Sequence, residues 1–245
     1  MTSTSFKLAV LECDQPLDAA RKALGGHTGV WTALFAEAAK SLNLPADRVI
    51  VIRYNAEETL PAFDEINGIL ISGSRYNAWE DIPWINNLVE FTKECVARKI
   101  PVIGICFGHQ IVGRALGSVV NRNEAGWEVA PTVLGLHDKG KEIFGKDTIT
   151  LHLMNRDIVR DCPAGFQVLA YTPKTSIHSL YKPGEVFTVQ GHPEFKPEIT
   201  GELLKMRNES KIIPDDTYQD ALSRLDNQHD GVLVTEAFVK FLGVA

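Results

Sequence analysis

PVIGICFGHQ, residues 101–110, contains the most abrupt change of pattern in this chain of 245 residues. An apolar, strand-like run ends at Cys106, and apolar residues with helical spacing continue to Leu116, which is typical of a buried parallel strand that turns sharply into a helix. Gly104 and Gly108 flank the cysteine as G-x-C-x-G, the cysteine form of a nucleophile elbow, where glycines let the two backbones approach closely. We therefore expect the Cys106 sulfur to stand above the sheet at a helix N-terminus, whose positive end favours the reactive thiolate.

Two other interpretations of Cys106 remain open at this point. Free cysteine is among the residue types most often buried, so the residue could serve only in packing. A redox sensor or a binding module could also keep an exposed thiol at such a turn. A nucleophilic role requires a base and an orienting acid elsewhere in the chain.

The overall composition excludes several classes of protein. Hydrophobic residues make up 44% and charged residues 23%, as in an ordinary globular protein, and we expect a single domain over residues 1–245. The net charge of −6, with scattered Lys and Arg, argues against nucleic acid or an anionic membrane as a partner. The four cysteines form no CxxC pair, which argues against a metal site or a disulfide framework and favours a reducing compartment. Without a signal-peptide pattern or a membrane-length apolar run, the expected location is cytoplasmic.

Strand-like and helix-like segments alternate along most of the chain, which predicts an α/β fold with an open, mostly parallel central sheet and helices on both faces. Residues 118–136 show strand-like alternation that is broken at residues 124–126, and this segment is expected to be antiparallel. The expected strands are 6–13, 48–54, 68–72, 101–105, 148–154, 167–171 and 185–190, and the expected helices are 30–42, 81 or 83 to 99, and the segment after Cys106. Residues 6–195 form the expected core, and residues 197–245 should add two or three amphipathic helices.

The second informative stretch is Gln190-Gly191-His192-Pro193-Glu194-Phe195, at the end of the last predicted strand. His192 is the candidate base, and Glu194 is the candidate acid that orients the imidazole and stabilises its protonated form. A histidine taken alone is more often solvated or satisfied within a core. Its pairing with Glu194 at a strand end, in a chain that also carries the elbow, favours a catalytic role.

The third predicted strand ends in Gly73-Ser74, and its position in the fold suggests a role for them. The C-terminal ends of parallel strands share one rim of the sheet, so these residues should lie near Cys106. The tetrahedral intermediate of an acyl transfer needs N–H donors for its oxyanion. We expect these to be the backbone N–H groups of Phe107 and of Gly73 or Ser74. No metal or cofactor is required.

The two motifs together resemble the class I glutamine amidotransferase family, with G-I-C-F-G-H-Q at residues 104–110 and Q-G-H-P-E-F at residues 190–195. The resemblance covers about residues 6–195 and implies a flavodoxin-like, three-layer fold. It also implies hydrolysis of a γ-glutamyl amide through a thioester on the cysteine, with Cys106, His192 and Glu194 as the catalytic triad. Family positions that hold the glutamyl group match four residues here, namely Ser74, Gln110, Trp127 and Asp157.

One departure from the family pattern concerns the acid that binds the glutamyl α-amino group in some members. Asp157 matches that acid, but the histidine that often precedes it by two residues is replaced by Asn155. Glutamine itself is therefore not necessarily the preferred substrate. Alternative interpretations are that Asp157 caps a helix and that Trp127 belongs to the core.

The family includes glutaminases that serve a synthetase, as in GMP synthetase, and stand-alone hydrolases. No acceptor or ATP-binding motif such as GxxxxGK[ST] is present, so a synthetase partner is possible but not implied. The segments Ile71–Ser74 and Ala78-Trp79, together with Gly126–Glu128, look more like the stand-alone members, among them γ-glutamyl peptidases. The loop Asp14–Gly29 follows the first strand and is the expected specificity element. A catalytically silent binding module is the third alternative.

Overall fold

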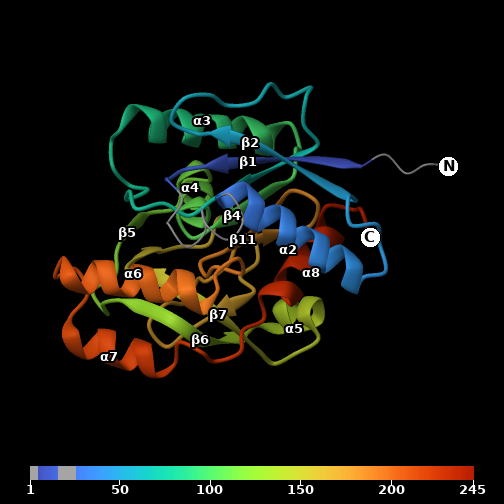
Figure 1. Cartoon of the computed structure of the whole chain (residues 1–245). Coiled ribbons are helices and arrows are strands. Elements are labelled where there is room, and N and C mark those ends of the chain that lie inside the picture. Colours follow the sequence, from blue (N-terminus) through green and yellow to red (C-terminus); the bar gives the residue numbers. More distant parts are fainter. Residues whose placement is uncertain (1–4, 16–25) are drawn as a thin grey trace.

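A six-stranded sheet runs through the computed structural model, which describes residues 5–15 and 26–245 (Figure 1). The strand order is β10-β11-β4-β3-β1-β2, and every neighbouring pair is parallel except β10 with β11. This confirms the predicted open, mostly parallel sheet. The strands are β1 Phe6–Glu12, β2 Val49–Asn55, β3 Gly68–Ile71, β4 Val102–Ile105, β10 Tyr181–Lys182 and β11 Val186–Val189.

Helices cover both faces of this sheet. Side chains alternate along β1, so Leu8 and Val10 pack in one cluster with α2 and α8, whereas Ala9 and Leu11 pack in the other with α3 and α4. Because both faces are buried, the strands are apolar at successive positions rather than at every second one. The helices are α2 His27–Ser41, α3 Pro83–Ala97, α4 Phe107–Ala115 and α8 Gly231–Phe241.

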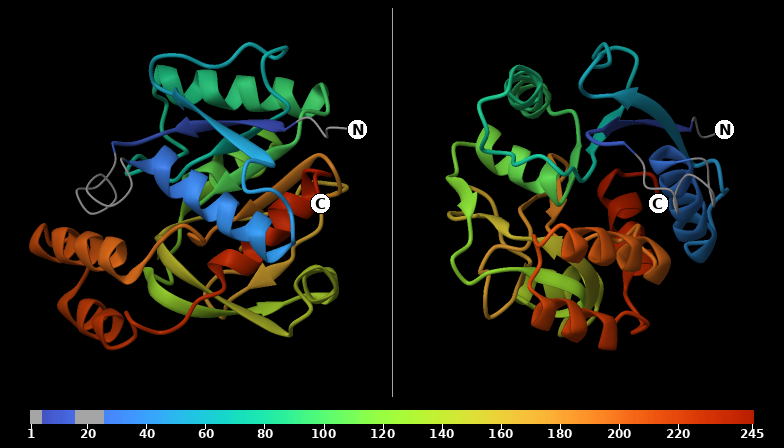
Figure 2. Two further views of the ribbon diagram at one scale, coloured as in Figure 1. Left: turned by 45° about the vertical axis from the view of Figure 1, so that its right-hand side comes forward. Right: turned by 60° about the vertical axis from the view of Figure 1, so that its left-hand side comes forward.

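A second, antiparallel region lies beside the central sheet (Figure 2). It contains the pairs of β6 with β7 and β9, and of β5 with β8, which confirms the antiparallel expectation for residues 118–136. The chain then adds α6 and α7 next to this region and α8 at the central sheet. The elements are β5 Val120–Arg122, β6 Glu128–Leu136, α5 Asp138–Phe144, β7 Thr148–Asn155, β8 Asp157–Val159, β9 Ala170–Tyr171, α6 Pro197–Glu209 and α7 Asp215–Ser223.

Several boundaries differ from the predicted ones for physical reasons. Helix α2 begins at His27 rather than near Val30, because the Glu12 carboxylate accepts hydrogen bonds from both the N–H and the Oγ1 of Thr28, at 3.0 and 2.5 Å. The pattern did not predict the seven-residue α5 or the short β8 and β10. The strand expected at 167–171 is reduced to β9. None of the helices within residues 5–15 and 26–245 is both long and apolar enough to cross a membrane.

Candidate active site

The turn between β4 and α4 holds Cys106 in a strained conformation, with φ 51° and ψ −100°. A Cβ atom on Gly108 would lie 2.2 Å from the carbonyl oxygen of Ile71, and one on Gly104 would lie 2.7 Å from that of Gly108. Neither site has room for a side chain. The two glycines therefore let the start of α4 pack closely against β3 and β4, and this packing fixes Cys106 at the C-terminal end of β4.

His192 and Glu194 follow β11, the strand that pairs with β4. Nδ1 of His192 lies 2.8 Å from Oε1 of Glu194, and the imidazole stacks on Phe195 with ring centroids 3.8 Å apart. The backbone N–H of His192 donates to the carbonyl of His152 in β7, at 2.8 Å. Contacts from three sides therefore fix the orientation of this imidazole.

The protonation state of His192 follows from its neighbours. Burial lowers the pKa of His192, but the charges of Glu194 and Cys106, together with hydrogen bonds to both, raise the pKa to about 10. These neighbours favour the protonated imidazole, and His192 and Cys106 line the same cleft.

The two backbone N–H groups expected to form an oxyanion hole also lie at this site. Phe107 begins α4, so its N–H has no acceptor within the helix. Gly73 lies so close to His192 that a Cβ atom would be 2.7 Å from the Cε1 of the imidazole. Within the described part of the chain, neither N–H donates a hydrogen bond to another protein group.

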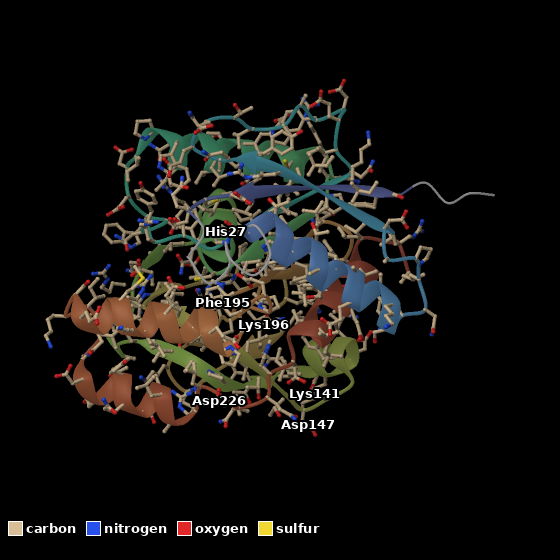
Figure 3. The ribbon with its side chains drawn as sticks, viewed as in Figure 1. His27, Lys141, Asp147, Phe195, Lys196 and Asp226 are labelled. Atoms are coloured by element: carbon tan, nitrogen blue, oxygen red, sulfur yellow. The ribbon has the colours of Figure 1, made fainter. Side chains whose placement is uncertain are left out.

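A cleft with two lobes opens on either side of Cys106. The larger lobe has a volume of about 420 Å³ and a largely apolar wall from α6, and the smaller lobe has a volume of about 50 Å³. Ser74, Cys106 and Arg207 line both lobes. Figure 3 labels His27, at the start of α2, and Phe195, which both line the larger lobe.

The loop expected to control specificity contributes Asp14 to the wall of the larger lobe. Asp14 accepts hydrogen bonds from the backbone N–H and the guanidinium of Arg75, so it ties this loop to the segment after β3. Residues 16–25 of the predicted loop lie outside the residues that the structure describes.

The smaller lobe is lined by all four residues that the family resemblance assigns to the glutamyl group, Ser74 among them. Nε2 of Gln110 donates to the backbone carbonyl of Asp157 at 2.8 Å and to Oε1 of Gln190 at 3.1 Å. Nε1 of Trp127 donates to the carbonyl of Ile212 at 3.1 Å, which fixes the ring to the segment after α6. Trp127 is half-buried at the edge of an apolar cluster, so the core interpretation describes only part of its environment.

Asp157 lies at the start of strand β8, so the interpretation of this residue as a helix cap is wrong. Its carboxylate accepts a hydrogen bond from Nε1 of Trp79 at 3.0 Å and forms an ion pair with Nε of Arg122 at 3.2 Å. Asp157 thus anchors the segment between β3 and α3 across the smaller lobe. The sequence assigned no role to Trp79 or Arg122, because no local motif links these residues to Asp157.

Arg207 is a further cleft residue that the sequence did not indicate. Its guanidinium carbon lies 5.1 Å from the centre of the Trp127 ring, and among the described residues it has no ion-pair partner. Burial lowers the pKa of Arg207, while the charges of Cys106 and Asp14 raise it. An arginine on a helix is usually solvated, so the sequence gives no reason to expect Arg207 at the cleft. Only the packing of α6 brings its side chain there.

In the described ranges, no three His, Cys, Asp or Glu side chains are placed to hold a metal ion. All four cysteines are unpaired, and Cys162 is the exposed one. The groups that line the cleft include the thiol of Cys106, the imidazole of His192 and the carboxylate of Glu194.

Known proteins are similar to this chain in sequence and in fold. The model of the family glutamine amidotransferase class-I matches residues 35–210. A glutamine amidotransferase-like protein of Schizosaccharomyces pombe is 32% identical over 97% of this chain and 98% of its own length. Gamma-glutamyl peptidase 3 of Arabidopsis thaliana is 28% identical over 97% of this chain and 96% of its own length. The crystal structure of a glutamine amidotransferase from Thermotoga maritima has a TM-score of 0.70 at 15% identity, covering 98% of this chain and 99% of that one.

Proposed function

Because the chain belongs to the class I glutamine amidotransferase family, we propose that it is a cysteine hydrolase that cleaves γ-glutamyl amide bonds. The observation that carries this proposal is the pairing of His192 with Glu194 at 2.8 Å, at the end of the strand next to a cysteine in a strained elbow. In this proposal Cys106, His192 and Glu194 are the catalytic triad. Ser74, Gln110, Trp127 and Asp157 form the walls of the acyl site in the smaller lobe.

The reaction follows from these positions. The Cys106 thiolate attacks the γ-carbonyl carbon, and the oxyanion that forms accepts hydrogen bonds from the N–H groups of Gly73 and Phe107. His192 gives its proton to the leaving nitrogen as the C–N bond breaks, which leaves a γ-glutamyl thioester. His192 then takes a proton from water, which attacks the thioester and releases the free γ-carboxylate and the Cys106 thiolate.

The larger lobe favours a stand-alone γ-glutamyl peptidase over an enzyme that releases only ammonia. A volume of about 420 Å³ holds a leaving group of several heavy atoms, whereas ammonia has one. The guanidinium of Arg207 borders this lobe and would attract a leaving group that carries a carboxylate. The similarity to gamma-glutamyl peptidase 3 of A. thaliana agrees with this choice. A cytoplasmic location remains a prediction that fits a thiol nucleophile.

Two alternatives stay testable. A glutaminase subunit would deliver ammonia to a separate synthetase, and a silent member of the family would keep the thiol only for binding or redox sensing. Steady-state hydrolysis of glutamine and of glutathione by the isolated chain, with Cys106→Ala as the blank, separates them. Turnover of glutathione that the variant loses supports the peptidase. Weak glutaminase activity alone, with a synthetase that co-purifies, indicates the subunit, and no turnover of either compound contradicts the proposed function.

A further inference from the structure

The smaller lobe carries an uneven set of charges. Four arginines line this lobe, and Asp157 is its one acidic residue among those that the structure describes. Arg75 is paired with Asp14 at 2.5 Å, and Arg122 is paired with Asp157 at 3.2 Å. Arg156 and Arg207 have no carboxylate partner in residues 5–15 and 26–245, and Nε of Arg156 is buried without a hydrogen-bond acceptor. The lobe therefore has an excess of positive charge.

The acid in this lobe already has partners. Each carboxylate oxygen of Asp157 accepts one hydrogen bond, from Trp79 on one side and Arg122 on the other, and the residue is only 7% exposed. Arg122 also donates to Oδ1 of Asn77 at 3.2 Å, so the same group of contacts holds the segment between β3 and α3. Asn155, which replaces the histidine of the family pattern, is uncharged and adds no acid. An ammonium group entering this lobe would find no unpaired carboxylate.

We propose that the smaller lobe recognises the acyl group of the substrate by its α-carboxylate, through Arg156 and Arg207, and does not require an α-ammonium group. This inference rests on the proposed γ-glutamyl hydrolase function and defines its substrate class more closely. Asp157 is then a positioning residue that anchors the segment carrying Trp79. Amides of glutaric acid and of N-acylated glutamate, linked through the distal carboxyl group, should be substrates alongside γ-glutamyl amides.

The physical reason is that a carboxylate beside guanidinium groups that lack a carboxylate partner makes charge-assisted hydrogen bonds that few other groups can replace. An α-ammonium group in the same space faces net repulsion and loses hydration. Removing the carboxylate should therefore cost far more than removing or acylating the amine.

Four p-nitroanilides that share one leaving group test whether loss of the carboxylate costs more than loss or acylation of the amine. They carry the acyl groups γ-glutamyl, N-acetyl-γ-glutamyl, glutaryl and 4-aminobutyryl, and the last lacks only the α-carboxylate. We expect kcat/KM for the first three to agree within about tenfold, and the value for the fourth to be lower by more than about 30-fold, as for loss of a charge-assisted interaction. A glutaryl or N-acetyl substrate that falls as far as the 4-aminobutyryl one would overturn the inference.

Variants distinguish recognition from a merely structural role. Arg156→Met should lower kcat/KM for the γ-glutamyl anilide and leave that for the 4-aminobutyryl anilide unchanged, with Arg156→Lys retaining part of the activity. Arg98→Met removes an exposed arginine directly after α3 and is the matched control, which should change neither value. Asp157→Asn should lower the γ-glutamyl and glutaryl values by the same factor. A selective loss of the γ-glutamyl substrate in Asp157→Asn would show that Asp157 binds the ammonium group.

A binding measurement keeps the inference testable if no anilide is hydrolysed, an outcome that counts against the proposed function alone. Calorimetric titration of Cys106→Ser with glutamate, glutarate and 4-aminobutyrate measures the affinity of the smaller lobe for each compound without turnover. We expect glutamate and glutarate to bind within about tenfold of each other and 4-aminobutyrate at least about tenfold more weakly. Equal or tighter binding of 4-aminobutyrate would refute carboxylate recognition.

Discussion

Replacing Gly73 with alanine adds a single methyl group against the imidazole of His192. The new Cβ atom would lie 2.7 Å from Cε1 of the ring, whereas carbon atoms in van der Waals contact are about 3.5 to 4.0 Å apart. Gly73 does not have a positive φ, so alanine fits the local backbone. The strain therefore falls on the contact with His192, and relieving it requires a relative movement of about 0.8 Å or more.

That movement should act on catalysis far more than on stability. The imidazole is held by Glu194 at 2.8 Å and by the ring of Phe195, so a shift weakens its alignment with Cys106. A misplacement near 1 Å typically costs about 100-fold in rate, and we expect a fall of that order in kcat with γ-glutamyl substrates. The free energy of unfolding should fall by no more than about 1 kcal/mol, because the strained contact lies at the wall of the cleft and not in the core.

The assay is steady-state hydrolysis together with urea unfolding of the same preparations. Gly117→Ala is the matched control, since Gly117 has φ +89° with nothing within 4 Å of a new Cβ atom. That variant should lose about 1 to 2 kcal/mol of stability, through the left-handed backbone, and keep its activity. If Gly73→Ala retained kcat within about threefold of the wild type, the argument that Gly73 spaces the imidazole would be refuted.

Three further predictions follow from charged groups. Because the pKa of His192 is raised to about 10 from its ordinary 6.5, the contribution of its charge to stability should be complete below pH 6.5 and lost as the pH rises toward 10. In Cys106→Ala the imidazole should lose its proton at a lower pH than in the wild type, and NMR titration of the ring measures this shift. Arg207→Met should raise KM for glutamine and for glutathione, because both carry the α-carboxylate that Arg207 binds. The rise should be larger for glutathione, whose leaving group also carries a carboxylate. An unchanged KM for glutamine would contradict a role toward the acyl group, and equal changes would contradict a role toward the leaving group. Burial raises the pKa of Glu128, but hydrogen bonds from His178 and two threonines lower it to about 2. The stabilisation that Glu128 provides should therefore be lost as the pH falls from 4.5 through 2. Glu128→Gln should lower the free energy of unfolding by about 1 to 3 kcal/mol at pH 7, and acid unfolding curves of this variant should depend less on pH.

Much of the central fold follows from patterns that are local in sequence. Buried strands of a parallel sheet are apolar at successive positions, and β1, β3, β4 and β11 were each predicted within one or two residues. Short or irregular elements were not predictable in the same way. Helix α5 has seven residues, and Gly140 within it packs against the carbonyl of Leu169, a contact distant in sequence that the local pattern does not contain.

The sequence by itself determined the catalytic candidates, because both motifs are compact. Cys106 between two glycines and His192 two residues before Glu194 each express a local requirement, a tight turn in the first case and a fixed spacing in the second. Only the tertiary structure decided what surrounds them. Asp157 is held by Trp79 and Arg122, and Arg207 reaches the cleft from α6, because these side chains come from separate elements whose contacts arise only when the sheet and helices pack.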